Sequence, residues 1–249
     1  DNIRNGLDIG AHIGSFSRKL LEKNISVIAF EPMKKTFSEL KKIEKENKGK
    51  FRCFNIALSN KIGVTEMYFT GPTSQLSSIA VNLKKLNFLK NKKIKKKKIK
   101  TDTLDNIAKR YKKLFNKKID FIKIDTEGND LKVLKGAIKT LKKHKPKLIQ
   151  IEMNYHYLFS GENLYQFSIL LKDYDIYQIL PFNNGVLNSE LFVSIDDDHG
   201  EQGYSLISRK QYPKRVPKKQ LDEIRKSKNN IFVPNPLKKT IEKIFTLFK

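Results

Sequence analysis

The sequence predicts an α/β fold in which a mostly parallel, twisted sheet carries helices on both faces. Two observations support this prediction. Apolar runs of strand length alternate with amphipathic stretches of helix length, which is typical of a parallel sheet covered by helices. The chain has 249 residues, of which 39% are hydrophobic, and this is enough for one large α/β domain with a substantial core.

The first part of the chain predicts the opening strands and helices of this sheet. The strands are short and apolar, and the helices place apolar side chains at three-residue spacing. In order we expect a strand at Gly6–Ile9, a helix at Ser15–Glu22, a strand at Ser26–Phe30, a helix at Lys34–Asn47, a strand at Phe51–Leu58 and an antiparallel strand at Gly63–Phe69.

A polar and then basic segment interrupts the alternation. We expect Gly71–Leu89 to form a lid or loop over a site. Ten lysines fall between Lys84 and Lys100. The end of this run, Ile94–Thr101, is expected to form an exposed edge strand, because lysine suits the open side of a sheet.

The remainder of the chain predicts the second half of the sheet and a basic tail. We assign residues 1–212 to one domain, whose N-terminal segment is expected to be missing, and 213–249 to a basic connector with an amphipathic C-terminal helix. The expected elements are a helix at Thr103–Phe115, a strand at Ile119–Ile124, a helix at Asp130–Lys143, a strand at Leu148–Met153, a helix at Asn163–Lys172, the last strands at Tyr174–Leu180 and Tyr204–Ser208, and the terminal helix at Leu237–Phe248.

The chain is strongly basic, with 51 Lys+Arg against 26 Asp+Glu and a net charge of +25. Two explanations are open: compositional drift toward lysine, or an anionic partner such as nucleic acid, a phosphorylated sugar or an acidic lipid or glycan. The single cysteine, Cys53, and the absence of a signal-like start favour a reducing, cytoplasmic location. No run approaches the about 18 apolar residues needed to cross a membrane. The terminal helix is expected to dock on the domain or, alternatively, on a membrane surface.

The strongest binding signal is the turn Asp8-Ile-Gly10-Ala-His12-Ile-Gly14 after the first strand. Glycines there let the chain turn tightly against a ligand before a helix begins. The D-x-G-x-x-x-G spacing lacks the third glycine position that holds a pyrophosphate, but it suits a cofactor that carries an amino acid instead. A purely structural glycine turn is the alternative.

About twenty residues after this turn, an acidic residue ends the second strand. Glu31 in the sequence Phe-Glu31-Pro is placed to accept hydrogen bonds from both ribose hydroxyls of an adenosine. Its position in register with the glycine turn favours the cofactor interpretation over the structural one.

A second group of polar residues follows two later strands. Asp125 ends the strand Ile119–Ile124, Glu127 lies in the next turn, and Glu152 ends a neighbouring strand. Ligands of open α/β sheets bind at this edge. Three roles are open for these carboxylates: oxygen ligands for a divalent cation such as Mg²⁺, a general base for a hydroxyl proton, or helix capping and salt bridges, for example with Lys123.

These motifs together resemble the FkbM family of methyltransferases. The resemblance rests on DIGAHIGSFS at residues 8–17, FEP at 30–32, NIALSN at 55–60, TDTLDNI at 101–107, and IDFIKIDTEGNDLKVLKGA at 119–137 with IE at 151–152. It implies a Rossmann-like class I methyltransferase fold that binds S-adenosylmethionine. Family members commonly methylate hydroxyls of sugars or natural products, many of them in surface polysaccharide modification.

The resemblance also implies roles for individual residues. Asp8, Gly10 and Gly14 are expected around the methionine and ribose of the cofactor, Glu31 on the ribose, and Asn55 and Ala57 near the adenine. Asp125, Glu127 and Glu152 are expected on the acceptor side. The sequence departs from the family at His12, where asparagine is expected. An imidazole still donates one hydrogen bond, so we keep His12 among the cofactor-binding residues.

The resulting hypothesis is an S-adenosylmethionine-dependent O-methyltransferase that acts on a hydroxyl of a sugar, glycan or related small molecule. Asp125 is the expected base, with Glu127 or Glu152 as its partner or as a metal ligand. Two alternatives stay open. An RNA-directed methyltransferase is suggested by the charge, although no RNA-binding module is recognisable. The other alternative is a binding or scaffold protein that keeps the fold without catalysis.

Overall fold

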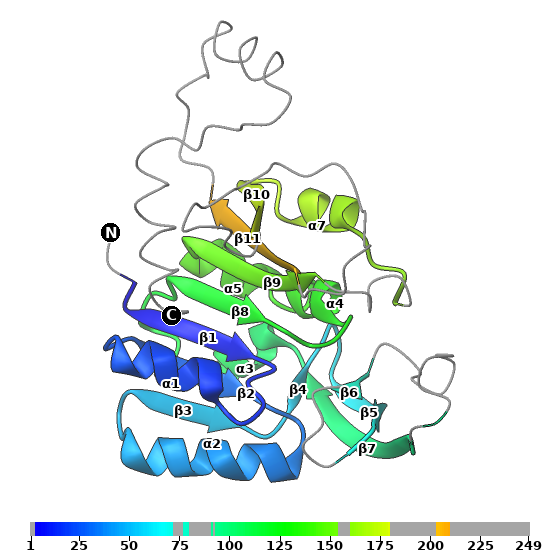
Figure 1. The fold of residues 1–249 in the computed structure, drawn as a ribbon. Helices are drawn as coiled ribbons and strands as arrows, with labels where there is room; N and C mark the ends of the chain where they lie inside the picture. The colour runs from blue at the N-terminus through cyan, green and yellow to red at the C-terminus, as the bar shows by residue number, and fades with distance from the viewer. Residues whose placement is uncertain are drawn as a thin grey trace, which may run out of the picture.

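The computed structural model describes residues 3–71, 77–79, 91, 93–153, 160–179 and 203–209. Within them, seven strands form one sheet in the order β10-β11-β9-β8-β1-β2-β3 (Figure 1). All neighbours pair in parallel except β11, which is antiparallel to both β9 and β10. The strands are β1 (Asn5–Ile9), β2 (Ser26–Phe30), β3 (Phe51–Phe54), β8 (Phe121–Ile124), β9 (Leu148–Met153), β10 (Tyr174–Ile179) and β11 (Gly203–Arg209).

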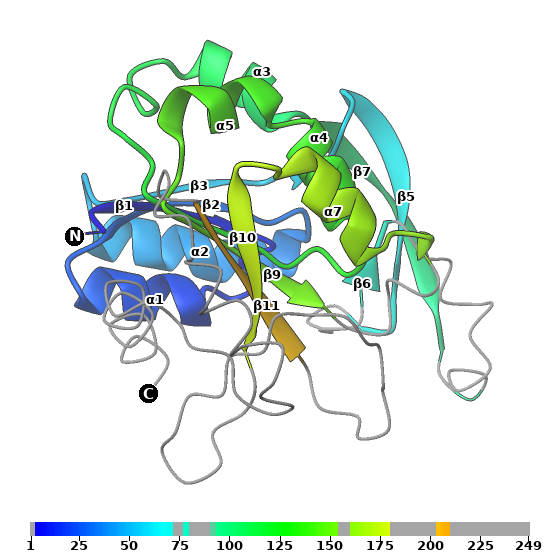
Figure 2. The same cartoon turned by 90° about the horizontal axis from the view of Figure 1, so that it is seen from above.

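Helices cover both faces of this sheet, as the view along it shows (Figure 2). The first face carries α1 (Ser15–Glu22) and α2 (Lys34–Glu46). The second carries α3 (Leu104–Arg110), α4 (Asp130–Lys135), α5 (Ile138–His144) and α7 (Leu164–Leu170). The predicted fold class, a mostly parallel sheet with helices on both sides, is therefore confirmed.

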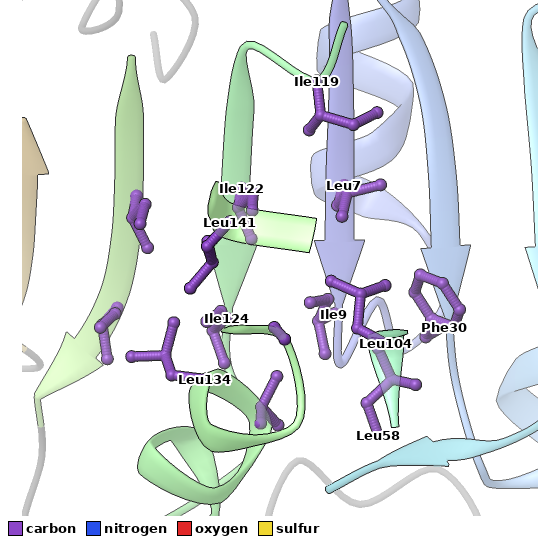
Figure 3. Packing of buried hydrophobic residues seen from close by; sticks show 14 of the residues in the cluster. Leu7, Ile9, Phe30, Leu58, Leu104, Ile119, Ile122, Ile124, Leu134 and Leu141 are labelled. Atoms are coloured by element: carbon purple, nitrogen blue, oxygen red, sulfur yellow. The ribbon is translucent and has the colours of Figure 1, made fainter. Parts of the chain in front are cut away.

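The core consists of two apolar layers, one on each face of the sheet. Successive residues of a strand point to opposite faces. Val27 and Phe121 accordingly join the layer beneath α1 and α2, whereas Ile28 and Ile122 join the layer on the other side. Figure 3 shows the second layer, in which Leu7 and other aliphatic side chains of β1 and β8 lie next to side chains from the covering helices. Because the central strands are buried on both faces, their sequences are continuous apolar runs.

A second, smaller sheet lies beyond the carboxyl ends of the central strands (Figure 1). Its order is β4-β7-β5-β6. Met67, Phe69 and Ile99 on one side of it pack with Met33 and Ala57 in a separate apolar cluster. The strands are β4 (Ala57–Leu58), β5 (Gly63–Phe69), β6 (Ser77–Ser78) and β7 (Lys95–Asp102).

Two expected elements are each divided in the structure. The expected strand Phe51–Leu58 is two strands, because β3 pairs with β2 in the large sheet whereas β4 pairs with β7 in the small one. The expected helix Asp130–Lys143 is α4 followed by α5, with Gly136 at the end of α4. A Cβ on Gly136 would lie 2.1 Å from the carbonyl oxygen of Ser59, so this close contact needs glycine.

The expected edge strand is present, but its end differs from the prediction. β7 pairs with β5 from Lys95 to Thr101 and with β4 at Thr101 and Asp102, so its end lies inside the small sheet. Residues 95–100 have no second partner among the strands described, so this part of β7 is an open edge.

Several sequence predictions fall outside the described residues. They are most of the lid at 71–89, the terminal helix at 237–248, and the proposed division after residue 212. No helix in the part of the chain that the structure describes is long and apolar enough to span a membrane.

Candidate active site

The register of the sheet gathers four predicted site residues at one edge. Ile9 of β1 pairs with Phe30 of β2 and with Ile124 of β8, and Ile124 pairs with Ile151 of β9. The next residue on each strand is therefore a neighbour of the others along the carboxyl edge. These residues are Glu31, Gly10, Asp125 and Glu152. The strand order reverses between β1 and β8, which is where open α/β sheets bind ligands.

Gly10 packs the first turn directly against the loop that follows β8. Its φ is 83°, and a Cβ there would lie 1.8 Å from the carbonyl oxygen of Asp125. Gly14, with φ of 85°, similarly leaves no room for a Cβ between α1 and the side chains of Leu40 and Ile43. The two glycines thus allow close packing, of Gly10 against backbone and of Gly14 against side chains.

Glu31 is held by the turn that it faces. One carboxylate oxygen accepts a hydrogen bond from the backbone N–H of His12 at 2.9 Å, and the other accepts from Met33 N–H at 2.8 Å. The residue is 5% exposed, and burial raises the pKa of its carboxyl group. Each oxygen has a second lone pair, so Glu31 retains acceptor capacity for a diol.

Asp8 and Asn55 support the site from behind. Asp8 is fully buried on β1, and one of its oxygens accepts a hydrogen bond from Ser17 of α1 at 2.6 Å. Burial raises the pKa of the Asp8 carboxyl group. The side-chain amide of Asn55 donates to the carbonyl oxygens of Glu31 at 2.9 Å and Pro32 at 3.0 Å, which fixes the backbone beyond β2.

The three predicted acceptor-side carboxylates lie together. Asp125, Glu127 and Glu152 each offer a carboxylate oxygen, and these oxygens lie within 4.8 Å of one another. The ammonium of Lys123 donates to an oxygen of Asp125 at 2.7 Å. The sequence hypothesis that these groups share one site is therefore consistent with their positions.

Asp125 and Glu152 differ in protonation. Burial alone would raise the pKa of Asp125, but the charge of the Lys123 ammonium, together with the hydrogen bonds from Glu152 and Lys123, holds the pKa below its ordinary value. Burial raises the pKa of Glu152 to about 10, and its hydrogen bond with Asp125 contributes to the rise. At neutral pH, Asp125 is thus the charged member of the pair and Glu152 the protonated donor.

The turn that carries Glu127 is fixed by the small sheet. Glu127 has φ of 55° and Gly128 has φ of 87°, so two successive residues adopt left-handed conformations. Ser78 of β6 donates from its hydroxyl to the carbonyl oxygen of Glu127 at 2.7 Å. Thr126 donates through N–H and hydroxyl to Asp130, at 2.9 and 2.8 Å, at the start of α4.

These groups surround one cavity of about 240 Å³. Its lining includes four acidic side chains, Glu31, Asp125, Glu127 and Glu152, and the ammonium of Lys123. The lining also includes an apolar set, which comes from the segment after β2, from the small sheet and from residues next to its strands: Pro32, Ile56, Ala57, Leu58, Met67 and Ile79. The cavity therefore offers acidic side chains for cationic and hydroxyl groups and apolar surface for a flat apolar group.

Most predicted site residues line this cavity, and three support it from outside. The lining includes Gly10, His12 and Ala57 as well as the four carboxylates. Asp8, Gly14 and Asn55 lie outside the lining. The sequence analysis missed Phe16, Ile56, Met67, Ile79 and Asn129, and it considered Lys123 only as a structural partner of the acids. The spacing Lys123-x-Asp125 is a usable signal, because residues two apart on a strand share a face.

The strand order, the glycine turn and the acidic residue after β2 define the class: this is a class I S-adenosylmethionine-dependent methyltransferase. The family model described as the methyltransferase FkbM domain matches residues 8–206. The chain therefore belongs to the FkbM methyltransferase family, as the motifs predicted.

Solved structures of similar fold are distant in sequence. The chain is similar to an S-adenosylmethionine-dependent methyltransferase from Clostridium acetobutylicum, at 11% identity and a TM-score of 0.44, with 84% of this chain and 85% of that one covered. It is similar to an rRNA methylase from Streptococcus thermophilus, at 9% identity and a TM-score of 0.42, with 85% and 89% covered. No curated protein matches it by sequence.

The cavity has the chemistry that S-adenosylmethionine requires. The cofactor carries a ribose diol, a cationic sulfonium, an amino-acid group and an adenine. Glu31 offers acceptors for the diol, and the acidic side chains of the lining favour the sulfonium charge. The apolar wall around Ile56 and Ala57 suits the adenine face.

Proposed function

We propose that this protein transfers a methyl group from S-adenosylmethionine to a hydroxyl of a sugar, glycan or related small molecule that is neutral near the reacting oxygen. The observation that carries the proposal is the carboxylate cluster of Asp125, Glu127 and Glu152 in the same cavity as Glu31. A cluster of acceptors suits a polyol. Phosphate groups close to the reacting hydroxyl would be repelled by these carboxylates.

The cofactor supplies an activated methyl group on its sulfonium, so the protein mainly positions the reactants. We assign Glu31 to the ribose, Gly10 and His12 to the turn that faces the cofactor, and Ala57 to the adenine side. Asp8, Gly14 and Asn55 hold these groups in place. Each of these seven assignments is a proposal that rests on placement in or beside the cavity.

Asp125 is proposed as the base. As a lone pair of the acceptor oxygen forms a bond to the methyl carbon, the carbon–sulfur bond breaks and its electrons stay on sulfur. The hydroxyl proton passes to Asp125, which leaves a methyl ether and S-adenosylhomocysteine. Glu152 donates its hydrogen bond to Asp125, and Glu127 is placed to accept from a neighbouring acceptor hydroxyl.

The first experiment is calorimetric binding of S-adenosylmethionine and S-adenosylhomocysteine, with NAD as the control. We expect micromolar binding of the first two ligands and none of NAD. Labelled S-adenosylmethionine then serves to screen sugars, glycans and nucleotides as acceptors. A folded sample that binds neither methyl-cofactor species would contradict the proposal and favour the scaffold alternative.

The base assignment is tested by comparing amide variants. We expect Asp125→Asn to keep cofactor affinity within about threefold but to lower kcat by roughly 10²- to 10⁴-fold, the usual contribution of a general base. Glu152→Gln retains a hydrogen-bond donor, so we expect a much smaller decrease in kcat. Asp173→Asn, at an exposed position, is the control for the same substitution outside the cavity, and its kcat should equal that of the wild type. Full turnover by Asp125→Asn would remove Asp125 from the mechanism.

An RNA acceptor is the second candidate, and the exposed lysines of β7 favour it. The two candidates differ in where the polyanion would lie, because the lysines are on the surface whereas the cavity is acidic. Methyl transfer to RNA but to no sugar in the same screen would select this alternative. We propose a cytoplasmic location, which suits the single buried cysteine, Cys53, and contact with a membrane surface stays a proposal for the basic tail.

A further inference from the structure

Lys123 differs in burial from the other basic residues of this chain. Among the residues whose burial the structure describes, it is the only lysine or arginine that is buried, with 8% exposure. Long charged side chains are almost never buried unless they are paired. Its position inside the candidate active site therefore calls for a specific role.

The surroundings of Lys123 are rich in hydrogen-bond acceptors. Its ammonium donates to Asp125 at 2.7 Å and lies 5.4 Å from the centre of the Phe16 ring. Its register partners on the neighbouring strands are Asp8 on β1 and Gln150 on β9. One side-chain oxygen on each partner is buried without a hydrogen bond to any described residue. An ammonium has three donors, so it matches this ring of acceptors.

The sequence left a divalent cation open as the ion held by Asp125, Glu127 and Glu152. Such an ion prefers several oxygen ligands, and the cluster offers them. However, an ion bound to Asp125 would lie close to the Lys123 ammonium, and repulsion between the two cations is strong in a buried site. The Asp125 carboxylate is thus already paired with a cation, the ammonium of Lys123 on the strand that Asp125 directly follows.

We infer that Lys123 is the built-in cation of this active site: it positions Asp125 and supplies the positive charge beside it, so that methyl transfer needs no divalent metal ion. The inference rests on the proposed function for its catalytic part. Lys123 acts through Asp125, so it is a positioning residue. The ionisable groups around the pair are Asp8 from β1, Glu152 from β9, and Glu127 and His12 from the flanking turns.

Metal binding provides a test that needs no acceptor. Mn²⁺ is titrated into wild-type protein and into Asp125→Asn, and the free ion is followed by electron paramagnetic resonance. We expect the wild-type protein and Asp125→Asn to bind Mn²⁺ equally weakly or not at all. We also expect EDTA to leave turnover unchanged. Wild-type binding at micromolar Mn²⁺ that is lost in Asp125→Asn, or turnover that EDTA abolishes and Mg²⁺ restores, would overturn the inference.

The positioning role is tested with Lys123→Met, which keeps the length of the side chain but removes the charge. We expect S-adenosylmethionine affinity within about threefold of wild type, kcat lowered at least about 100-fold, and the acid limb of the kcat profile moved to higher pH. Lys109→Met, at an exposed position on α3, should change none of these quantities. Wild-type kcat with an unmoved acid limb would overturn the role.

A second measurement covers the case in which Lys123→Met does not fold or no acceptor is found. The carboxyl carbon of Asp125 in ¹³C-labelled wild-type protein is followed by NMR as a function of pH. We expect titration below the ordinary range for aspartate, whereas titration above it would overturn the inference. If the acceptor screen fails but Asp125 titrates at low pH, the proposed function is contradicted, whereas the inferred pairing of Lys123 with Asp125 is supported.

Discussion

At the scale of single residues, the Glu31 carboxylate both holds the backbone of the site in place and lines the cavity. Its two oxygens accept hydrogen bonds from backbone N–H groups on either side of the cavity's edge, from His12 in the first turn and from Met33 at the start of α2. Glu31 also lines the cavity. The carboxylate therefore shapes the turn, and its remaining lone pairs are available for the ribose hydroxyls that we propose it binds.

Glu31→Gln should weaken cofactor binding strongly. The amide keeps one acceptor oxygen but turns an NH₂ donor toward one of the two backbone N–H donors, so that a hydrogen bond is lost and the turn is displaced. Hydrogen bonds to a charged group contribute roughly 1.5–3 kcal/mol, so we expect the Kd for S-adenosylmethionine to rise about 10- to 100-fold. Calorimetry measures the change.

The matched control for this substitution is Glu39→Gln on α2, a half-exposed residue whose side chain contacts Lys42. It should bind the cofactor like the wild type. Equal affinities for Glu31→Gln and Glu39→Gln would show that Glu31 does not contact the ribose.

At the scale of elements, the sequence predicts those segments whose shape depends on local pattern. Ser15–Glu22 and Ser26–Phe30 form as predicted because helix and strand periodicity alone define them. The sequence also predicts that the glycine turn and the acidic residues after β2 and β8 and at the end of β9 lie together, because parallel strands bring their carboxyl ends to one edge of the sheet.

The elements that sequence reasoning missed depend on contacts between distant segments. The division between α4 and α5 coincides with the approach of Gly136 to Ser59, and β4 leaves the large sheet because it pairs with β7. The bond from Ser78 to Glu127 joins residues 49 positions apart in the sequence. No local pattern marks these contacts, so the small sheet's part in the site became visible only in the structure.

A further contact of this kind joins the start of α4 to the segment before α7. Glu162 is buried, and one of its oxygens accepts a hydrogen bond from the N–H of Leu131 at 3.1 Å. Burial raises the pKa of Glu162 to about 7, and the nearby Asp130 carboxylate adds to the rise. Because the unfolded chain loses this proton at lower pH than the folded protein, stability should fall as pH rises from about 4.5 to about 7.

Glu162→Gln should remove this pH dependence. The amide oxygen still accepts from Leu131, and the side chain does not ionise. Relative to the variant, we expect the wild-type free energy of unfolding to fall by roughly 2 kcal/mol between pH 5 and pH 8, since each pKa unit corresponds to about 1.4 kcal/mol. Urea unfolding at the two pH values measures it. Glu22→Gln, exposed on α1, is the control, and parallel pH profiles for wild type and Glu162→Gln would contradict the prediction.

At the scale of the whole molecule, charge is divided between surface and cavity. The chain carries a net charge of +25, yet the lining of the cavity has four acidic side chains and one ammonium. The positive field acts on anions at the surface, where salt screens it within about 10 Å at 0.1 M. The groups that we propose to react lie in a cavity whose ionisable lining is mainly acidic. The surface charge therefore attracts polyanions without defining the acceptor's reacting group.

This separation predicts that surface lysines and methyl transfer are independent. Replacing Lys95, Lys97 and Lys98, all exposed on β7, with glutamine should weaken binding of single-stranded RNA. It should also reduce the slope of log affinity against log salt by about 2 if each lysine contacts a phosphate. Turnover of a neutral acceptor should stay within twofold. Fluorescence anisotropy across a salt series and a labelled-methyl assay measure the two effects.

The control removes the same charge elsewhere, by replacing Lys109, Lys112 and Lys113 with glutamine. Equal losses of RNA affinity in both triple variants would mean that RNA binding depends only on net charge. A larger loss for the β7 variant would mean that RNA contacts the lysines of β7. Turnover of the neutral acceptor decides whether the surface lysines and methyl transfer are independent. If turnover falls with the β7 lysines and not with the control set, the acceptor reaches across the small sheet, and an anionic part of it lies outside the acidic cavity.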